Sequence, residues 1–86
     1  MSTTVPSDHV VTVRYWAGAR AAAGVASDLV SGSTVDEVVA AAVALRPGLR
    51  PVAAVATFLV DGSAAPRDRP VPAGATVEVL PPFAGG

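Results

Sequence analysis

One stretch decides the fold: Thr76-Val77-Glu78-Val79-Leu80-Pro81-Pro82-Phe83-Ala84-Gly85-Gly86. Its first five residues alternate between two faces in the manner of a β-strand, with Val77 and Val79 on one side. The two prolines fix φ and supply no backbone N–H, so the strand must end at Leu80 and the chain leaves it extended. The final glycines carry no Cβ, so another protein's backbone or a nucleotide can approach them closely. The stretch therefore predicts a last strand that carries a stiff, slim tail suited to a narrow partner site.

Length and composition restrict the chain to a single small globular domain. It has 86 residues, of which 51% are hydrophobic and 15% charged, a balance suited to a folded chain. The net charge of −1 offers no electrostatic footprint for nucleic acid. The sequence contains no cysteine, which excludes disulfides, thiolate metal sites and a cysteine nucleophile. We accordingly expect no nucleic-acid partner, no metal and no stably bound cofactor.

The first nine residues, Met1 to His9, are expected to form a disordered arm. They are polar, contain Pro6 and lack the apolar segment of a signal peptide. The single histidine, His9, is expected to be solvated and to have no catalytic or metal-binding role. No apolar run approaches the length of a membrane span, so we expect a cytoplasmic protein with no membrane partner.

Strand signals recur before the last strand. In the first of them, Val11, Val13 and Tyr15 share the face that is expected to meet the core. The same alternation leaves Trp16 on the outer face near the strand's end, where it is either covered by a loop or serves as an interface anchor. The pattern predicts strands at residues 10–16, 25–31 and 55–60, a tight turn at Asp61-Gly62 and a brief pairing at residues 63–65.

One helix dominates the rest of the pattern, and it begins at a capping box. The side chain of Thr34 can bond the amide of Glu37, whose carboxylate can reach back, so we interpret this carboxylate as a cap and not as a catalytic group. Apolar residues then recur at helical spacing from Val35 to Val43, and Pro47-Gly48 ends the helix. The remaining segments predict a short helix at residues 17–23 and a loop or short turn at residues 49–54.

The order strand, strand, helix, strand, minor strand, strand predicts an α+β fold, the β-grasp, with a mixed sheet of four to five strands packed on one main helix. In that fold the first and last strands are parallel neighbours at the sheet centre, which places Arg14 beside Glu78 and Trp16 beside Leu80. The second pair would be an exposed apolar patch, which small monomers seldom leave without a partner. The chain thus divides into an arm (1–9), a β-grasp domain (10–80) and a flexible tail (81–86).

After residue 9, nearly the whole chain resembles the small subunits of molybdopterin synthase, within the MoaD/ThiS-type family of ubiquitin-like sulfur carriers. Residues 11–20 resemble the family's first strand and following helix, where an aromatic pair precedes a small residue and an arginine. The helix start at residues 34–37 is similar as well. The most specific match is residues 77–86, with the double proline before Gly-Gly. Residues 49–54 and 63–69 align poorly, so no site is assigned there.

The resemblance implies a sulfur carrier. An adenylyltransferase of the ubiquitin-activating type would use ATP to adenylate the carboxylate of Gly86, with Gly85 as its slim neighbour, and a sulfur donor would convert it into a thiocarboxylate. The large catalytic subunit of molybdopterin synthase, expected to form a heterotetramer with the carrier, would take the tail. Sulfur would then pass to cyclic pyranopterin monophosphate in molybdenum cofactor biosynthesis. The carrier itself would supply no catalytic acid or base.

The partner-binding residues are expected to be Trp16, Leu80, Pro81, Pro82 and Phe83. Two other functions stay open. Carriers of thiamine and cysteine biosynthesis are similar in fold and in the Gly-Gly end, although their tails more often lack the double proline. A β-grasp interaction module with an inert tail is the alternative outside sulfur transfer.

Overall fold

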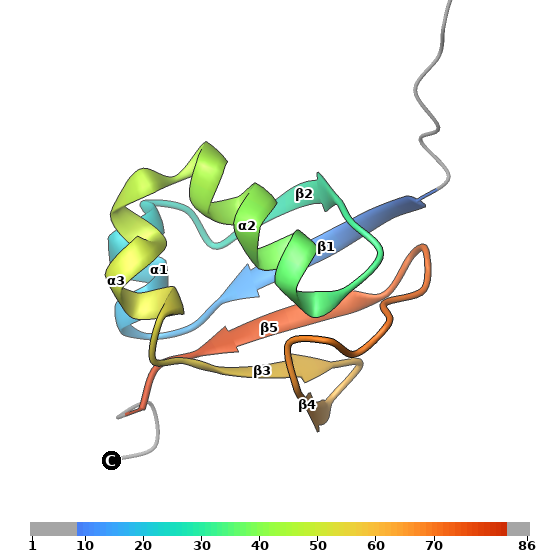
Figure 1. Cartoon of the computed structure of the whole chain (residues 1–86). Coiled ribbons are helices and arrows are strands. Elements are labelled where there is room, and N and C mark those ends of the chain that lie inside the picture. The colour runs from blue at the N-terminus through green and yellow to red at the C-terminus, as the bar shows by residue number, and fades with distance from the viewer. Residues whose placement is uncertain (1–8, 83–86) are drawn as a thin grey trace, which may run out of the picture.

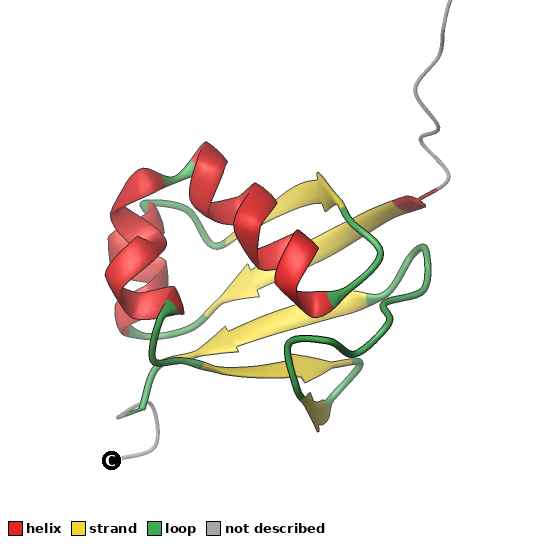
Figure 2. Ribbon diagram, viewed as in Figure 1, coloured by secondary structure: helices red, strands yellow, loops and turns green. Residues whose placement is uncertain are grey.

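The computed structural model describes residues 9–82, and its elements form two layers (Figures 1 and 2). A five-stranded sheet makes one layer, and helices packed on one of its faces make the other. In chain order the elements are β1 (Val10–Tyr15), α1 (Gly18–Ala23), β2 (Ser27–Ser31), α2 (Val35–Leu45), the 3-10 helix η2 (Pro47–Leu49), α3 (Arg50–Ala53), β3 (Thr57–Val60), β4 (Ser63–Ala65) and β5 (Thr76–Leu80). The predicted arm, apart from His9, and the tail beyond Pro82 lie outside the described residues.

The sheet has the strand order β2-β1-β5-β3-β4, which confirms the predicted β-grasp. Strands β1 and β5 are parallel, whereas β1 with β2, β3 with β4 and β3 with β5 are antiparallel. The parallel register sets Arg14 opposite Glu78, as predicted. Because β1 and β5 run in the same direction, the residues that follow them emerge at the same end of the sheet.

The core lies between the sheet and α2. The side chains of Val11, Val13 and Tyr15 are buried as predicted, each 3% exposed or less. Val77 and Val79 form the matching buried face of β5. Helix α2 packs on this surface through Val35, Val38, Val39 and Ala42. Burial of each valine side chain stabilises the fold by about 1.5 kcal/mol or more. The helix therefore covers the sheet face that carries the valines of β1 and β5.

The predicted cap of α2 is present with one difference. The Oγ1 of Thr34 accepts a hydrogen bond from the Glu37 amide at 3.2 Å. The Glu37 carboxylate reaches back one residue further than a simple capping box, to the backbone N–H and the hydroxyl of Ser33, both at 2.8 Å. The hydrogen bonds from Ser33 hold the pKa of Glu37 below its ordinary value. This carboxylate is therefore a helix cap, as the sequence indicates.

The loop predicted at residues 49–54 is wrong, because this segment is helical. Residues Pro47–Leu49 form η2 and Arg50–Ala53 form α3, and Leu49 is fully buried. Pro47 and Pro51 each occupy the first turn of their helix. A proline there sacrifices no hydrogen bond and has the φ that a helix needs, so these prolines start helices and do not mark a loop.

Three further local predictions concern the turn at Asp61-Gly62, the end of β1 and the environment of His9. Asp61 and Gly62 both have positive φ, at 48° and 87°, which is the primed hairpin turn that Asp-Gly predicts between β3 and β4. Strand β1 stops at Tyr15, one residue earlier than predicted, so Trp16 lies just beyond it. His9 is half-buried, with Nε2 3.0 Å from the Val71 carbonyl oxygen, so the prediction of a solvated side chain is wrong.

A polar cluster ties β1, β2 and the end of α2 together. The carboxylate of Asp28 accepts two hydrogen bonds from the Arg46 guanidinium, at 3.0 and 2.7 Å, and one from the Tyr15 hydroxyl at 2.9 Å. The Arg46 bonds, supported by that of Tyr15, hold the pKa of Asp28 below its ordinary value, although burial acts in the opposite direction. Burial also raises the pKa of Tyr15, which keeps its hydroxyl neutral as a donor.

The lowered pKa of Asp28 predicts an acid dependence of stability. The ionised carboxylate stabilises the fold above its unfolded-state pKa of about 4, and this contribution is lost as the pH falls through the lower folded-state pKa. We expect Asp28→Asn to lower the free energy of unfolding at pH 7 by about 1 kcal/mol and to flatten its decline below about pH 4. Urea unfolding across that pH range measures both effects.

Asp68→Asn is the matched control, because Asp68 is exposed in the loop after β4. It should keep the acid dependence of the wild type. An Asp28→Asn protein whose stability declines in acid as steeply as the wild type would contradict the assignment.

Candidate functional site

The tail root, which we define as Leu80 and Pro81, lies beside the turn that follows β1. Strand β5 ends at Leu80, opposite Thr57 at the start of β3. The amide of Trp16 donates a hydrogen bond to the Val79 carbonyl at 3.2 Å. This bond continues the pairing of β1 and β5 to the residue that follows β1. A Cβ added to Gly18 would lie only 3.9 Å from Cγ of Pro81, so the first tail residue passes close to α1. The parallel strand pair thus brings Trp16 and the tail root together.

A strained turn at Ala17 fixes the position of Trp16. Ala17 has φ 48° and ψ −123°, a backbone conformation that residues with a Cβ rarely adopt. The carbonyl of Trp16 accepts hydrogen bonds from the amides of Ala19 and Arg20, at 2.9 and 3.4 Å. The chain therefore reverses directly after Trp16, which holds this residue at the end of the sheet.

The indole of Trp16 is exposed, and two neighbouring side chains contact it. It is 39% exposed, which settles the choice between a covered and an exposed tryptophan in favour of exposure. Its Nε1–H donates to Oε2 of Glu78 at 2.9 Å. The guanidinium carbon of Arg14 lies 4.8 Å from the ring centroid, within cation–π range. Two side chains of neighbouring strands thus hold the ring from its edge and from one face.

The helices cover one face of the sheet and leave the other open (Figure 2). Arg14 and Glu78 alternate with the buried residues of β1 and β5, so both lie on the open face. Leu29 on β2 is 68% exposed, while Leu59 and Leu80 are half-buried. The register sets Leu59 and Arg14 on either side of Glu78, so this face carries an apolar residue next to a pair of opposite charges. Such a mixed face, with a fixed aromatic at its edge, can bind a protein surface.

Of the predicted partner-binding residues, the structure brings some together and leaves others undescribed. Trp16 and the half-buried Leu80 and Pro81 lie at the same end of the sheet, and Pro82 is exposed. The ladder of β1 and β5 stops at Tyr15 with Val79, so the predicted pair of Trp16 with Leu80 is not part of it. Phe83, Gly85 and Gly86 lie outside the described residues.

Arg14 and Glu78 both contact the Trp16 indole, and the sequence did not predict this. The sequence predicted only that Arg14 lies beside Glu78 on the neighbouring strand. The i, i+2 spacing of Arg14 and Trp16 on one strand face was the available signal.

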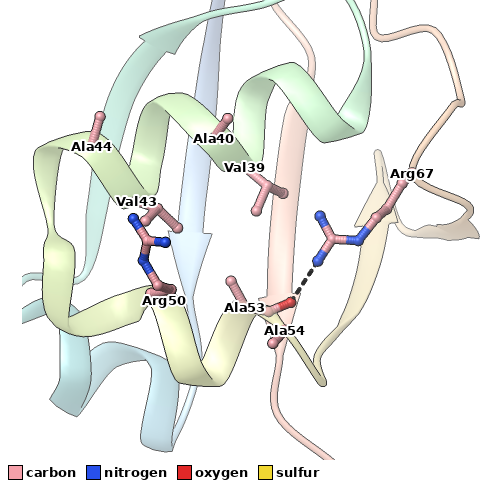
Figure 3. A pocket seen from close by; sticks show the side chains of 8 residues that line it. All are labelled: Val39, Ala40, Val43, Ala44, Arg50, Ala53, Ala54 and Arg67. Atoms are coloured by element: carbon pink, nitrogen blue, oxygen red, sulfur yellow. Dashed lines mark hydrogen bonds between the residues drawn. The ribbon is translucent and has the colours of Figure 1, made fainter.

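A hollow lies between α2 and α3 (Figure 3). Its walls are valine and alanine side chains of the two helices, with Arg50 and Arg67 at its rim. The Arg67 guanidinium donates to the Ala53 carbonyl and to Asp36, at 2.8 and 2.9 Å, and lies over the Phe58 ring. Arg67 therefore fastens the loop after β4 to α3. The lining residues include no nucleophile, histidine or carboxylate.

Within residues 9–82, acidic and histidine side chains form no group of three that could hold a metal ion. None of the helices in this range combines the length and the apolar character needed to cross a membrane.

The fold matches those of solved structures over most of the chain. SAMP1 from Haloferax volcanii aligns with a TM-score of 0.81 and 23% identity, over 90% of this chain and 99% of that one. The small archaeal modifier protein 1 from Methanosarcina acetivorans gives a TM-score of 0.80 and 22% identity, over 90% and 96%. A chain in the complex of subunits 1 and 2 of the molybdopterin-converting factor from Helicobacter pylori 26695 gives a TM-score of 0.68 and 19% identity, over 90% and 99%.

A comparison with curated proteins found no match. The sequence model of the ThiS family, in contrast, matches residues 13–86, which include the second half of β1, the helices, β5 and the Gly-Gly residues. The chain therefore belongs to the ThiS family, a family of ubiquitin-like β-grasp proteins to which the sequence resemblance points.

Proposed function

We propose that this protein is a sulfur carrier and acts as the small subunit of a molybdopterin synthase. The observation that carries the proposal is the family match, which continues through Gly86 and takes in the Pro-Pro-Phe-Ala-Gly-Gly tail. The placement of the tail root supports it, because Pro81 leaves the sheet beside Trp16 and next to the open sheet face. A partner that binds this face can receive the tail in an adjoining narrow site.

The reacting group in this proposal is the carboxylate of Gly86. A carboxylate is a poor electrophile, so it first attacks the α-phosphorus of ATP in the activating enzyme and releases pyrophosphate. The resulting acyl adenylate has AMP as its leaving group. A persulfide sulfur of the donor adds to the carbonyl carbon, and AMP departs with the carboxylate oxygen. Reductive cleavage of the S–S bond by a thiol leaves the thiocarboxylate on Gly86.

The carrier's own residues bind and position, and its partners supply the reactive groups. The glycines before the carboxylate leave room for a narrow site, because neither has a Cβ. The large catalytic subunit would then bind the same sheet face and accept sulfur into cyclic pyranopterin monophosphate. The similar Helicobacter pylori structure is a complex of subunits 1 and 2 of the molybdopterin-converting factor.

A carrier for another acceptor, such as those of thiamine or cysteine biosynthesis, is the second candidate. It would use the same activation chemistry, and the family match supports it equally. The double proline of Pro81 and Pro82 favours the molybdopterin acceptor. An interaction module with an inert tail would need no activation at all, which makes activation the discriminating experiment.

The mechanism requires that the reacting carboxylate belong to Gly86. We expect that adding one alanine after Gly86 prevents activation, because the carboxylate would lie beyond the reach of the adenylation site. Deletion of Gly86 should have the same effect. Intact mass after incubation with ATP, a sulfur source and the activating enzyme measures the product. One alanine inserted between Met1 and Ser2 is the control and should leave activation unchanged; normal activation of the extended tail would refute the mechanism.

Trp16 is expected to anchor the partner. Replacing Trp16 with alanine removes a partly exposed aromatic at the tail root and should weaken binding of the large subunit by about 1–3 kcal/mol. Phe83→Ala should act similarly if the partner covers that residue. Calorimetric titration measures the loss.

Leu45→Ala is the matched control, since Leu45 is 52% exposed but lies on α2 in the helical layer. It should bind like the wild type. Unchanged affinity of both Trp16→Ala and Phe83→Ala would show that the docking surface lies elsewhere.

A further inference from the structure

Glu78 occupies the centre of the open sheet face and bonds to its aromatic edge. It lies on β5, the middle strand, with Arg14 of β1 on one side and Leu59 of β3 on the other. Its carboxylate accepts the Trp16 Nε1–H at 2.9 Å, across 62 residues of sequence. This bond is exposed to water, so it adds little to the stability of the free protein.

The same bond gains importance when a partner covers the ring. An indole N–H that is buried without an acceptor costs about 1–3 kcal/mol, because it gives up its hydrogen bond to water. Glu78 already satisfies this donor, so the ring can be covered without that loss. Arg14 lies over the ring and restricts it further, which lowers the conformational entropy that docking must remove.

We propose that Glu78 is a positioning residue for docking to the activating enzyme: it holds the Trp16 indole, with its N–H already bonded, in the orientation in which an apolar pocket of that enzyme covers it. The inference rests on the proposed function, since that function makes this face the docking face. It adds Glu78, which lies outside the Pro-Pro-Phe-Ala-Gly-Gly tail, to the residues proposed for docking. It also specifies the partner's chemistry, which is an apolar pocket for the ring that needs no acceptor of its own for the indole N–H.

Two variants of equal charge isolate the hydrogen bond. Glu78→Gln and Glu78→Met both remove the negative charge and keep a side chain of similar length. Only glutamine retains an oxygen that can accept the indole N–H. Each full-length variant is compared with the wild type in three measurements: the thermal unfolding midpoint, the fluorescence anisotropy decay of the free protein, and the KM and kcat of thiocarboxylate formation by the activating enzyme. The sequence has a single tryptophan, so the fluorescence reports on Trp16 alone.

We expect Glu78→Gln to stay within about twofold of the wild type in KM. Glu78→Met should raise KM about tenfold with kcat unchanged, the pattern of weakened docking, and should loosen the indole in the free protein. Its unfolding midpoint should match that of Glu78→Gln, because the bond is exposed.

The outcomes separate the two proposals. Equal KM values for the three proteins, or a Glu78→Met effect that merely follows a lower unfolding midpoint, would overturn the role of Glu78 alone. Failure of the wild type to gain sulfur from an activating enzyme that is competent on another carrier would overturn the proposed function, and the docking role with it.

Discussion

The parallel pairing of β1 and β5 is the constraint on which the rest of the structure depends. Two parallel strands at the centre of a sheet deliver their following residues to the same end, however far apart they are in sequence. Here that geometry places Trp16 next to the last residues of β5 and the root of the tail. The family match and the proposed docking face both include this junction.

The two faces of the sheet differ in their contacts, because successive strand residues point to opposite faces. On one face, the valines of β1 and β5 meet the apolar stripe of α2 and close the core. On the other, Arg14 and Glu78 stand side by side and both contact the indole of Trp16. This charged pair interrupts the apolar surface of the open face, and both of its members contact the aromatic side chain at the end of the sheet. The core therefore fixes the backbone, and the backbone register fixes the residues that we propose for docking.

Features that depend on local chemistry could be predicted from the sequence. The buried face of β1, the cap formed by Thr34 and Glu37, and the positive φ at Asp61-Gly62 each follow from spacing or from side chains within a few residues. The central β1–β5 pair followed from the order of the elements. The missing Cβ of Gly85 and Gly86 indicated a slim tail for a narrow partner site, but the chemistry of the Gly86 carboxylate was inferred from the family resemblance, because it depends on a partner and not on the fold.

Features that depend on tertiary context could not be predicted. Prolines 47 and 51 are compatible with both a loop and a helix start, and only the packing of the buried Leu49 favours the helices. The chain reversal after Trp16 has its positive φ at Ala17 and not at the neighbouring Gly18, so the sequence did not mark it. Consequently the sequence placed Trp16 beside Leu80, whereas the indole bonds to Glu78.

The intact mass of the wild-type protein after incubation with ATP, a sulfur source and its activating enzyme tests the central claim most directly. We expect a mass gain equal to the exchange of one oxygen for one sulfur, and fragmentation should locate that gain at Gly86. An unchanged mass, with an activating enzyme shown to be competent on another carrier, would contradict the claim that this protein carries sulfur.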